Sequence, residues 1–456
     1  MDTKKLRQKI LDLAIRGKLV PQDPNHEPAS VLLERIKAEK ERLIKEGKIK
    51  RSKKRTKTSD TPHYENVPFE IPDNWVWTTI EEICSKIGSG STPKGSNYSV
   101  KGIPFFRSQN VYNDKLVYDD IKYISEEVHQ KMKGTEVLAN DLLLNITGGS
   151  LGRCTVVPAD FNCGNVSQHV CIMRSVLVEP EYFHALVLSS YFAKSMKITG
   201  SGREGLPKYN LEQMAFPLPP LTEQQRIVTE IEHWSALINE IKQGKADLQI
   251  TIKQTKSKIL NLAIHGKLVP QNPNDEPASE LLMRINPKAE ITCDNAQYTQ
   301  LPEGWQIVSM QTLCNLIDGE KQSGIERINL DVKYLRGERD AKKLMAGKYI
   351  PANSLLILVD GENSGEVFRT PIDGYQGSTF KQLSITDEMN ADYVLLVINL
   401  HRKTLRENKV GSAIPHLNKK LFKAIEVPIP PYNQQKRIVE AINIVFKHLD
   451  TIMESL

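Results

Sequence analysis

An internal duplication constrains this chain more than any other feature of its sequence. Residues 9–36, KILDLAIRGKLVPQDPNHEPASVLLERI, recur at 258–285 as KILNLAIHGKLVPQNPNDEPASELLMRI, and only six of the 28 positions differ. Two shorter pairs accompany it: Ile71-Pro-Asp-Asn-Trp75 with Leu301-Pro-Glu-Gly-Trp305, and a proline-rich segment at 217–228 with another at 428–439. A repeat must be recognised before a fold is assigned, because each copy is one structural unit. The chain is therefore expected to fold as two related halves.

The two proline-rich segments are predicted to open long helices. Their prolines cannot continue a central strand, Thr222 and Gln225 have the form of a capping box, and Asn433 can cap the second copy. Apolar residues spaced alternately by four and three predict a coiled-coil seam over about 222–265, which Gly266 is placed to end. The seam consists of Ile227, Ile231, Trp234, Ile238, Ile241, Leu248, Ile252, Ile259 and Leu262.

The second copy of this helix is split between the two ends of the chain. Its seam continues through Ile438, Ile442, Val445, Leu449, Ile452 and Leu456, and its missing half corresponds to Leu6, Ile10 and Leu13. We infer a circularly permuted repeat whose two helices lie antiparallel and whose termini meet. Oligomerisation is the alternative use of such a seam, but the duplication supplies a matched partner within one chain.

Between the helices, both intervening segments alternate short apolar stretches with Gly, Asn and Ser turns, as at 102–107, 141–146 and 354–359. This pattern predicts mixed α/β domains with short strands. The expected fold is α+β, with two mixed α/β domains separated by two long antiparallel coiled-coil helices about a pseudo-twofold axis. The expected boundaries are 1–67 for half of the second helix with a basic linker, 68–220 for the first domain, 221–297 for the central helix and linker, 298–431 for the second domain, and 432–456 for the remaining half helix.

The composition is that of a soluble globular protein. The 456 residues are 39% hydrophobic and 25% charged, and the length alone suggests about three structural units. No run approaches the roughly 18 apolar residues of a membrane helix, so we expect a cytoplasmic protein. The net charge of +6 is concentrated, because residues 34–58 carry a balance of +8 and the remainder −2. The run at 48–57 is predicted to be a solvated tether, with a phosphate-binding arm as the second interpretation.

The repeated motifs resemble those of one protein family. GKLVPQ at 17–22 and 266–271, LPEGW at 301–305 and PLPPLTEQQRIV at 217–228 resemble the specificity (S) subunit of type I restriction-modification enzymes. The resemblance covers nearly the whole chain. It implies two target-recognition domains, each of which binds one half of a bipartite DNA site, and helical spacers that dock two methyltransferase subunits.

The same resemblance implies where the cofactors bind. It places S-adenosylmethionine on the methyltransferase partner and ATP with Mg on a restriction partner where one joins, and it implies no cofactor on this chain. Two different domains on a spacer of fixed length should require an asymmetric DNA site. Its halves should lie near one helical turn, or about 34 Å, apart if both domains face the same side of the duplex.

Candidate DNA-binding residues are polar or basic side chains on Gly-rich loops, where backbone can approach phosphate and Arg, Asn or Gln can pair with base edges. A solvated surface role is the alternative for each. In the first domain the candidates are Ser91, Thr92, Lys94, Arg107, Gln109, Asn110, Thr147, Ser150, Arg153, Arg203 and Lys208. In the second they are Lys321, Gln322, Arg336, Arg339, Asn363, Lys381, Lys409, Ser412 and His416.

The candidate partner surface is the LVPQ segment, with Leu19 and Val20 in one copy and Leu268 and Val269 in the other. Two equal surfaces are what two identical partners require.

We expect no catalytic residues and no metal site. The nearest metal constellation, Cys154, Cys163, His169 and Cys171, matches no common zinc spacing, and buried structural thiols are favoured. No GxxxxGK[ST] loop is present, and Ile429-Pro-Pro-Tyr432 lacks the Asn or Asp of a base-methylating loop. Asp360-Gly-Glu362 is interpreted as a turn rather than a metal-binding pair.

Two other functions are weighed against DNA recognition. One is a coiled-coil scaffold whose two domains bind proteins. The other is the specificity lobe of a single-chain restriction-modification enzyme, which is disfavoured because both ends of the chain are used to complete the second helix.

Overall fold

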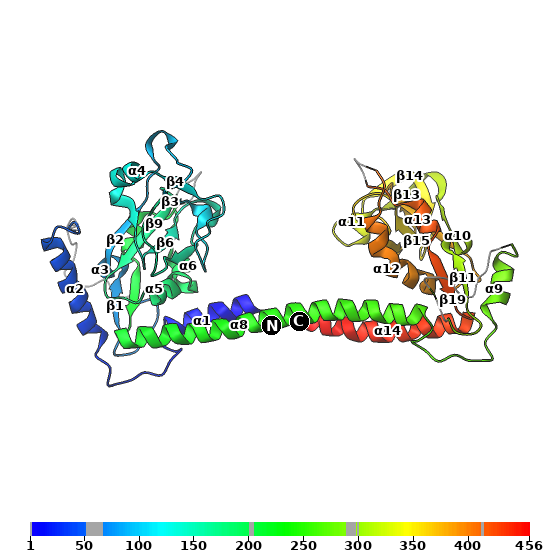
Figure 1. Cartoon of the computed structure of the whole chain (residues 1–456), viewed down its shortest axis with the longest axis horizontal. Coiled ribbons are helices and arrows are strands. Elements are labelled where there is room, and N and C mark those ends of the chain that lie inside the picture. The colour runs from blue at the N-terminus through cyan, green and yellow to red at the C-terminus, as the bar shows by residue number, and fades with distance from the viewer. Residues whose placement is uncertain (1, 52–66, 200–204, 289–297, 299–300, 412–414) are drawn as a thin grey trace. The chain divides into compact units, whose positions relative to one another are not determined.

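The computed structural model of the chain describes residues 2–51, 67–199, 205–288, 298, 301–411 and 415–456. The chain divides into two compact units, Met1–Gly244 and Lys245–Leu456. Each unit contains an α/β domain and a pair of helices (Figure 1). Within the described residues, no helix is long and apolar enough to cross a membrane.

Helix α8 (Leu221–Ile264) matches the helix predicted over about 222–265. Gly266 follows it with a φ of +68°, a conformation that favours glycine and ends helices. The expected caps are wrong. Thr222 and Asn433 lie inside the first turns, because α8 begins at Leu221 and α14 (Tyr432–Ser455) begins at Tyr432 without a side-chain cap.

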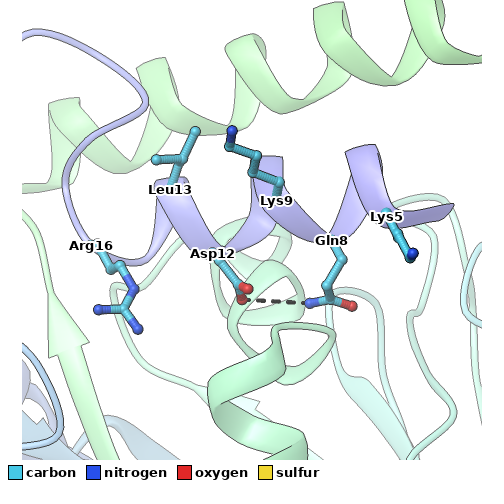
Figure 2. Close-up of a pocket in the computed structure, with 6 residues that line it drawn as sticks. All are labelled: Lys5, Gln8, Lys9, Asp12, Leu13 and Arg16. Carbon is cyan, nitrogen blue, oxygen red and sulfur yellow. Dashed lines mark hydrogen bonds between the residues drawn. The ribbon is translucent and has the colours of Figure 1, made fainter. Parts of the chain in front are cut away.

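In the first unit, helix α1 (Thr3–Ala14) lies beside the first half of α8 (Figure 1), and the Arg7 guanidinium donates a hydrogen bond of 3.1 Å to the Asn239 side chain. The opposite face of α1 holds the α/β domain. There Asp12 accepts hydrogen bonds from the backbone amide and the hydroxyl of Ser190, at 2.8 and 2.7 Å. Figure 2 shows Asp12 and Gln8 joined on this face, while Leu13 points to the other side of the helix. Helix α1 therefore connects α8 to the domain.

In the second unit, α14 packs antiparallel to the second half of α8. Lys256 forms an ion pair with Asp450, whereas Lys245, eleven positions earlier, donates to the backbone carbonyl of Leu456. The apolar side chains between the two helices are buried where they meet the domain core, as at Leu260 and Ile438.

The predicted heptad seam is only partly correct in α14. Val445 and Ile452 are exposed, whereas the neighbouring Phe446 and Met453 are half-buried. A straight α-helix drifts by about 20° per heptad relative to a strict 3.5-residue repeat, so its contacting face moves to the next residue along the chain. Leu248 of the α8 seam is also exposed.

Helix α2 (Ala29–Lys45) occupies residues that were predicted to belong to a linker. Arg42 forms ion pairs with Glu39 and Glu46, one turn away on either side. The Lys40 ammonium donates to two backbone carbonyls of α3 (Ile80–Ile83), at 2.6 and 2.9 Å, and burial lowers the pKa of Lys40. Part of the basic stretch is thus a helix with neighbouring charges paired. The corresponding helix of the second unit, α9 (Ala278–Ile285), is shorter.

In each α/β domain, the first strand pairs with the last strand. In the first, β1 (Val76–Thr79) pairs antiparallel with β10 (Ala215–Leu218), and in the second, β11 (Gln306–Ser309) pairs antiparallel with β19 (Glu426–Ile429). The repeated tryptophans immediately precede β1 and β11, and the repeated prolines lie at the ends of β10 and β19. Because the two ends of each domain lie side by side, the helices before and after the domain can remain close together.

The two domains share one four-stranded antiparallel sheet, although their sequences differ. The strand order is β2-β9-β6-β7 in the first and β12-β18-β15-β16 in the second. The bounds in the first are β2 Cys84–Ser89, β6 Leu142–Asn145, β7 Cys154–Val156 and β9 Val170–Ser175. In the second they are β12 Cys314–Ile317, β15 Leu355–Leu358, β16 Val367–Arg369 and β18 Phe380–Ile385. The apolar stretches predicted as strands at 141–146 and 354–359 are β6 and β15.

A second set of strands completes each domain, and it contains one parallel pair in both. In the first domain the order is β4-β3-β8-β5, with β3 and β8 parallel; in the second, β13, β14 and β17 close on one another, with β13 and β17 parallel. The bounds are β3 Ile103–Phe106, β4 Lys122–Ile124, β5 Glu136–Val137, β8 Gly164–Val166, β13 Glu320–Leu330, β14 Lys343–Ile350 and β17 Gly374–Gln376. The stretch predicted as a strand at 102–107 is β3.

Several helices complete each domain. In the first domain they are α4 Glu126–Lys131, α5 Pro180–Val187, α6 Ser190–Ser195 and α7 Lys208–Glu212. In the second they are α10 Met310–Leu313, α11 Val332–Leu335, α12 Ala391–Glu407 and α13 Lys419–Lys423. One main hydrophobic core in each unit joins domain and helices, with Trp75 and Ile227 in the first and Trp305 and Ile438 in the second. The mixed α/β prediction is confirmed for both domains.

Candidate nucleic-acid interface

One loop has the same backbone hydrogen bonds in both domains. In the first domain it follows β6, where the Ile146 amide donates to the His169 carbonyl at 3.0 Å and the Ile146 carbonyl accepts from Leu206 at 2.8 Å. In the second it follows β15, where Val359 makes the same two bonds with Thr379 and Leu417, at 2.9 and 2.7 Å. The loops at 146–153 and 359–366 are therefore equivalent, and we call them the common loops.

Each common loop closes on itself and on a segment far along the chain. A glycine with positive φ, Gly152 in one loop and Gly365 in the other, donates its amide back to the last residue of the strand, at 2.9 and 2.7 Å. An isolated bridge joins Thr147 to Gly205 in the first domain, and another joins Asp360 to His416 in the second. The segments at Gly205, after α6, and at His416, after α12, are thus brought beside the common loops.

In the first domain, Asn145 links two candidate loops. Its side chain is fully buried, and its amide nitrogen donates to the Ser108 carbonyl at 2.8 Å and to the Ser150 hydroxyl at 3.1 Å. The Arg153 guanidinium lies over the exposed ring of Tyr112, at 4.9 Å from its centroid. Residues 107–113 and the common loop consequently form one surface.

Arg107 and Gln109 both contact Asp120. The Arg107 guanidinium donates to the Asp120 carboxylate at 3.1 Å and the Gln109 amide donates to it at 3.0 Å, and these bonds lower the pKa of Asp120. Asn110 differs from its neighbours because it is fully buried. Its amide donates to the Val117 carbonyl at 3.0 Å, so its side chain holds the loop and offers no edge to a base.

Other first-domain candidates lie near the same surface. Ser91, Thr92 and Lys94 follow β2 and are exposed, and the Thr92 hydroxyl bonds to Gln168. The Thr147 hydroxyl bonds to the His169 ring at 2.7 Å. In the described part of the chain Lys94 makes no ion pair, whereas Lys208 pairs with Glu212 within α7. Arg203 lies outside the described residues.

In the second domain, several candidate side chains contact carboxylates. Lys409 forms an ion pair with Glu362 at 2.7 Å, and the His416 ring forms a hydrogen bond of 2.6 Å with the Asp360 carboxylate, so both side chains contact the common loop. The Lys409 ammonium lowers the pKa of Glu362. Arg336 forms an ion pair with Glu366 at the end of the same loop, and the half-buried Asn363 lies within it.

The remaining second-domain candidates are held elsewhere on the domain. Lys381 pairs with Asp318 at 2.6 Å and Arg339 with Asp331. Lys321 is exposed on β13, and the side-chain amide oxygen of Gln322 beside it is buried without a partner in the described residues. Ser412 lies outside the described residues. Within those residues, no side-chain hydrogen bond connects Lys321 or Lys381 to the common loop.

The LVPQ segments predicted to bind partners are partly used by the fold. Leu19 and Val20 are half-buried against the first core, and Leu268 and Val269 are half-buried against the second. The lysines that precede them, Lys18 and Lys267, are exposed.

Sequence reasoning missed the residues that organise the loops. Asn145, Gln168 and Glu366 were not selected, and Asp360 and Glu362 were interpreted only as a turn. Alignment of the apolar strands β6 and β15 would have revealed the equivalence of the two loops, because each strand leads into a Gly-rich segment of similar length. The ion pairs themselves join residues far apart in the sequence, and no spacing rule predicts them.

The cysteines do not form a metal centre in the described part of the chain, where no group of three or more His, Cys, Asp or Glu residues could hold a metal ion. Cys154 and Cys171 are buried among apolar residues of the first core. Burial raises the pKa of Cys171 to about 12, so its thiol is protonated at neutral pH.

Comparisons with known proteins place this fold in a family. The family model described as type I restriction modification DNA specificity domain matches residues 72–250 and 302–456. The specificity subunit of the type I restriction enzyme EcoAI from Escherichia coli is 30% identical over 69% of this chain, and the match spans 63% of that subunit's length. The EcoEI specificity subunit of Escherichia coli is 26% identical over 99% of this chain and 90% of its own length.

A solved structure has the same fold. The crystal structure of the HsdS subunit from Thermoanaerobacter tengcongensis matches 85% of this chain and 93% of its own chain, with a TM-score of 0.54 and 18% identity. The family model covers more than half of the chain, in two segments that each contain one of the α/β domains. The chain therefore belongs to the family of type I restriction-modification DNA specificity proteins.

Proposed function

We propose that this chain is a non-catalytic subunit that gives a type I restriction-modification complex its DNA sequence specificity. Each α/β domain contacts one half of an asymmetric, bipartite site in double-stranded DNA. The observation that carries the proposal is the pair of common loops, which have one backbone frame and different side chains. A shared frame presents each loop alike, while Thr147, Ser150 and Arg153 in one domain and Asn363, Lys409 and His416 in the other offer different groups to bases.

The helices supply the spacer in this proposal. Helix α8 is continuous between the two units, and α1 and α14 each pack against one half of it. This arrangement supports a circularly permuted repeat with coiled-coil pairs. A spacer of fixed length fixes the gap between the two half-sites, in the way that dimer geometry fixes half-site spacing in other DNA-binding proteins.

A methylation map at base resolution tests the proposal. Cells that express this chain with its methyltransferase partner should carry a split motif, two short blocks around a fixed gap, which cells with the methyltransferase alone lack. Arg107→Gln should alter only one block and Lys409→Gln only the other, because these residues lie in different domains. Absence of any chain-dependent motif from an active complex would contradict the proposal.

The alternative of a protein-binding scaffold predicts a different response to salt. Binding through phosphates should weaken steeply as salt is added, since each neutralised phosphate releases counterions. Protein contacts need show no such dependence and no preferred duplex. The salt dependence of DNA binding by the purified complex therefore separates the two functions.

For partner docking, we propose that the surface around the LVPQ segments binds the two methyltransferase subunits. Substitution of half-buried Val20 or Val269 would disturb the cores beneath them. Charge reversal at the exposed Lys18 and Lys267 is the sharper test. Each single variant should lose one partner and the double variant both, as measured by the mass of the complex; full assembly of the double variant would exclude this surface.

For residues 48–57, the alternative to a solvated tether is a non-specific DNA contact, which predicts the outcome of one deletion. Deletion of residues 48–57 should lower affinity uniformly across DNA sequences and reduce the salt dependence, because phosphate contacts carry no sequence information. A changed methylation motif with unchanged affinity would contradict this role.

A further inference from the structure

Each α/β domain meets its helices at a junction that is built in the same way twice. Gly17 after α1 and Gly266 after α8 both have positive φ, at +66° and +68°. A Cβ atom on Gly17 would lie 2.3 Å from the ring of Pro72, and one on Gly266 would lie 2.3 Å from the ring of Pro302. The prolines belong to the repeated domain entrances that contain the tryptophans. Only glycine allows this approach of helix end and domain entrance.

The segment after each glycine is tied down by hydrogen bonds that recur at the same distances. The Gln22 side chain donates to the Gly17 carbonyl at 3.2 Å, as the Gln271 side chain does to the Gly266 carbonyl. The first backbone amide of α2 donates to the entrance loop at 2.9 Å, and that of α9 does the same. The glutamine of the repeated GKLVPQ motif thus links the segment back to the helix end at each junction.

The other side of each junction is a buried polar contact with the start of a helix. Gln224 in α8 is fully buried; its amide donates to the Pro219 carbonyl at 3.0 Å and its oxygen accepts from the Glu179 backbone at 2.8 Å. Gln435 in α14 makes the two corresponding bonds, both at 3.0 Å. Since buried polar groups are costly to separate from their partners, these bonds oppose rotation of the domain on its helices.

We propose that these junction residues determine how strictly the complex keeps the gap between the two half-sites, although none of them needs to touch DNA. The inference rests on the proposed DNA-recognition function. One base pair added to the gap rotates the second half-site by about 34° and moves it by about 3.4 Å. A complex that distinguishes gaps differing by one base pair must therefore limit the rotation and displacement of each domain on its helix to less than these values. The glycine contact and the buried glutamines are the features that hold it.

The test uses Gly17→Ala and Gly266→Ala in the complex with methyltransferase, with Gly47→Ala as the matched control. Gly47 follows α2 with a φ of +71°, so alanine there meets the same backbone strain, but nothing lies within 4 Å of its Cβ position. The substrate is a DNA library that keeps both half-sites and varies the gap from two base pairs shorter to two longer than the native gap.

We expect the ratio of methylation at the native gap to methylation at gaps one base pair different to fall by about fivefold or more in the two junction variants. Gly47→Ala should keep the wild-type ratio, and the half-site sequences should be unchanged in every variant. If Gly17→Ala or Gly266→Ala does not fold, Gln22→Met and Gln271→Met remove the junction bonds without a clash and should lower the ratio in the same direction.

Folded and assembled junction variants that keep the wild-type ratio would overturn the inference while leaving the recognition function intact. A wild-type complex that shows no gap preference at all would instead overturn the proposed function. The two failures are therefore distinguished by the wild-type measurement.

Discussion

Replacing Asn145 with Leu, the residue at the matching strand position of the second domain, should release two loops of the first domain at once. The Asn145 amide donates to the Ser108 carbonyl and the Ser150 hydroxyl, and each bond contributes about 1 kcal/mol. The Ser108 carbonyl would keep only the long 3.4 Å bond from the Val111 amide, and this weaker pairing costs about 1 kcal/mol. The Asn145 oxygen is buried without a partner in the described residues, so its removal offsets a similar amount. The net loss should be about 2 kcal/mol.

Hydrogen exchange of the assembled complex measures how much more often the two loops open. Amides in 107–113 and 147–153 should exchange roughly 30-fold faster, the factor that corresponds to about 2 kcal/mol of local opening. The methylation map should lose selectivity in one block of the motif and keep the other. Leu358→Val, a conservative change at the same strand position in the second domain, is the control. Unchanged exchange in both loops, or equal loss of both blocks, would refute the reasoning.

Four further outcomes are expected. Glu362→Gln should free Lys409 for phosphate, raising DNA affinity and steepening the salt slope by about one unit in a salt titration. Lowering the pH to about 5 should not imitate this variant: the pKa of Glu362 is lowered, so the pair persists above the ordinary glutamate pKa of about 4.3 and is lost only as the pH falls below it. Lys40→Met should destabilise the first unit by about 1 kcal/mol in thermal unfolding, because two hydrogen bonds to α3 are lost, whereas Lys37→Met on the exposed face should not. A thiol reagent at pH 8 should label Cys163 before the other described cysteines, which are buried, and peptide mass spectrometry would show the order.

Much of the helical frame could be predicted because duplication marks it in the sequence. The start and end of α8 lie within one residue of the expected positions, because Pro220 directly precedes the helix and Gly266 lies just after its end. The strands β6 and β15 were also found, because short apolar runs between turns have few alternatives. Helix α2 was missed because its charges were counted as a net balance. Their spacing, with Arg42 one turn from Glu39 and from Glu46, was the signal for a helix.

The candidate site was predicted less completely, since side-chain partners depend on the tertiary fold. Arg107 and Asp120 are 13 residues apart, and Lys381 and Asp318 are 63 apart. Asn110 is a residue type that can pair with a base edge, but its side chain is buried like that of a structural residue. Its neighbours on a loop do not distinguish these roles, whereas the exposure of its side chain does.

The separation in sequence between α1 and its partner helix imposes an order on synthesis. Arg7 and Asn239 are 232 residues apart, so at 5–20 residues per second α1 leaves the ribosome roughly 10 to 50 seconds before its partner segment. During that interval the face of α1 that packs against α8 has no partner helix, whereas its opposite face can already pack on the α/β domain. Helix α14 meets the opposite situation, because its half of α8 is already made when α14 emerges. The face of α1 that packs against α8 therefore stays uncovered for longer than the matching face of α14, and a chaperone that binds short apolar segments has more time to bind there.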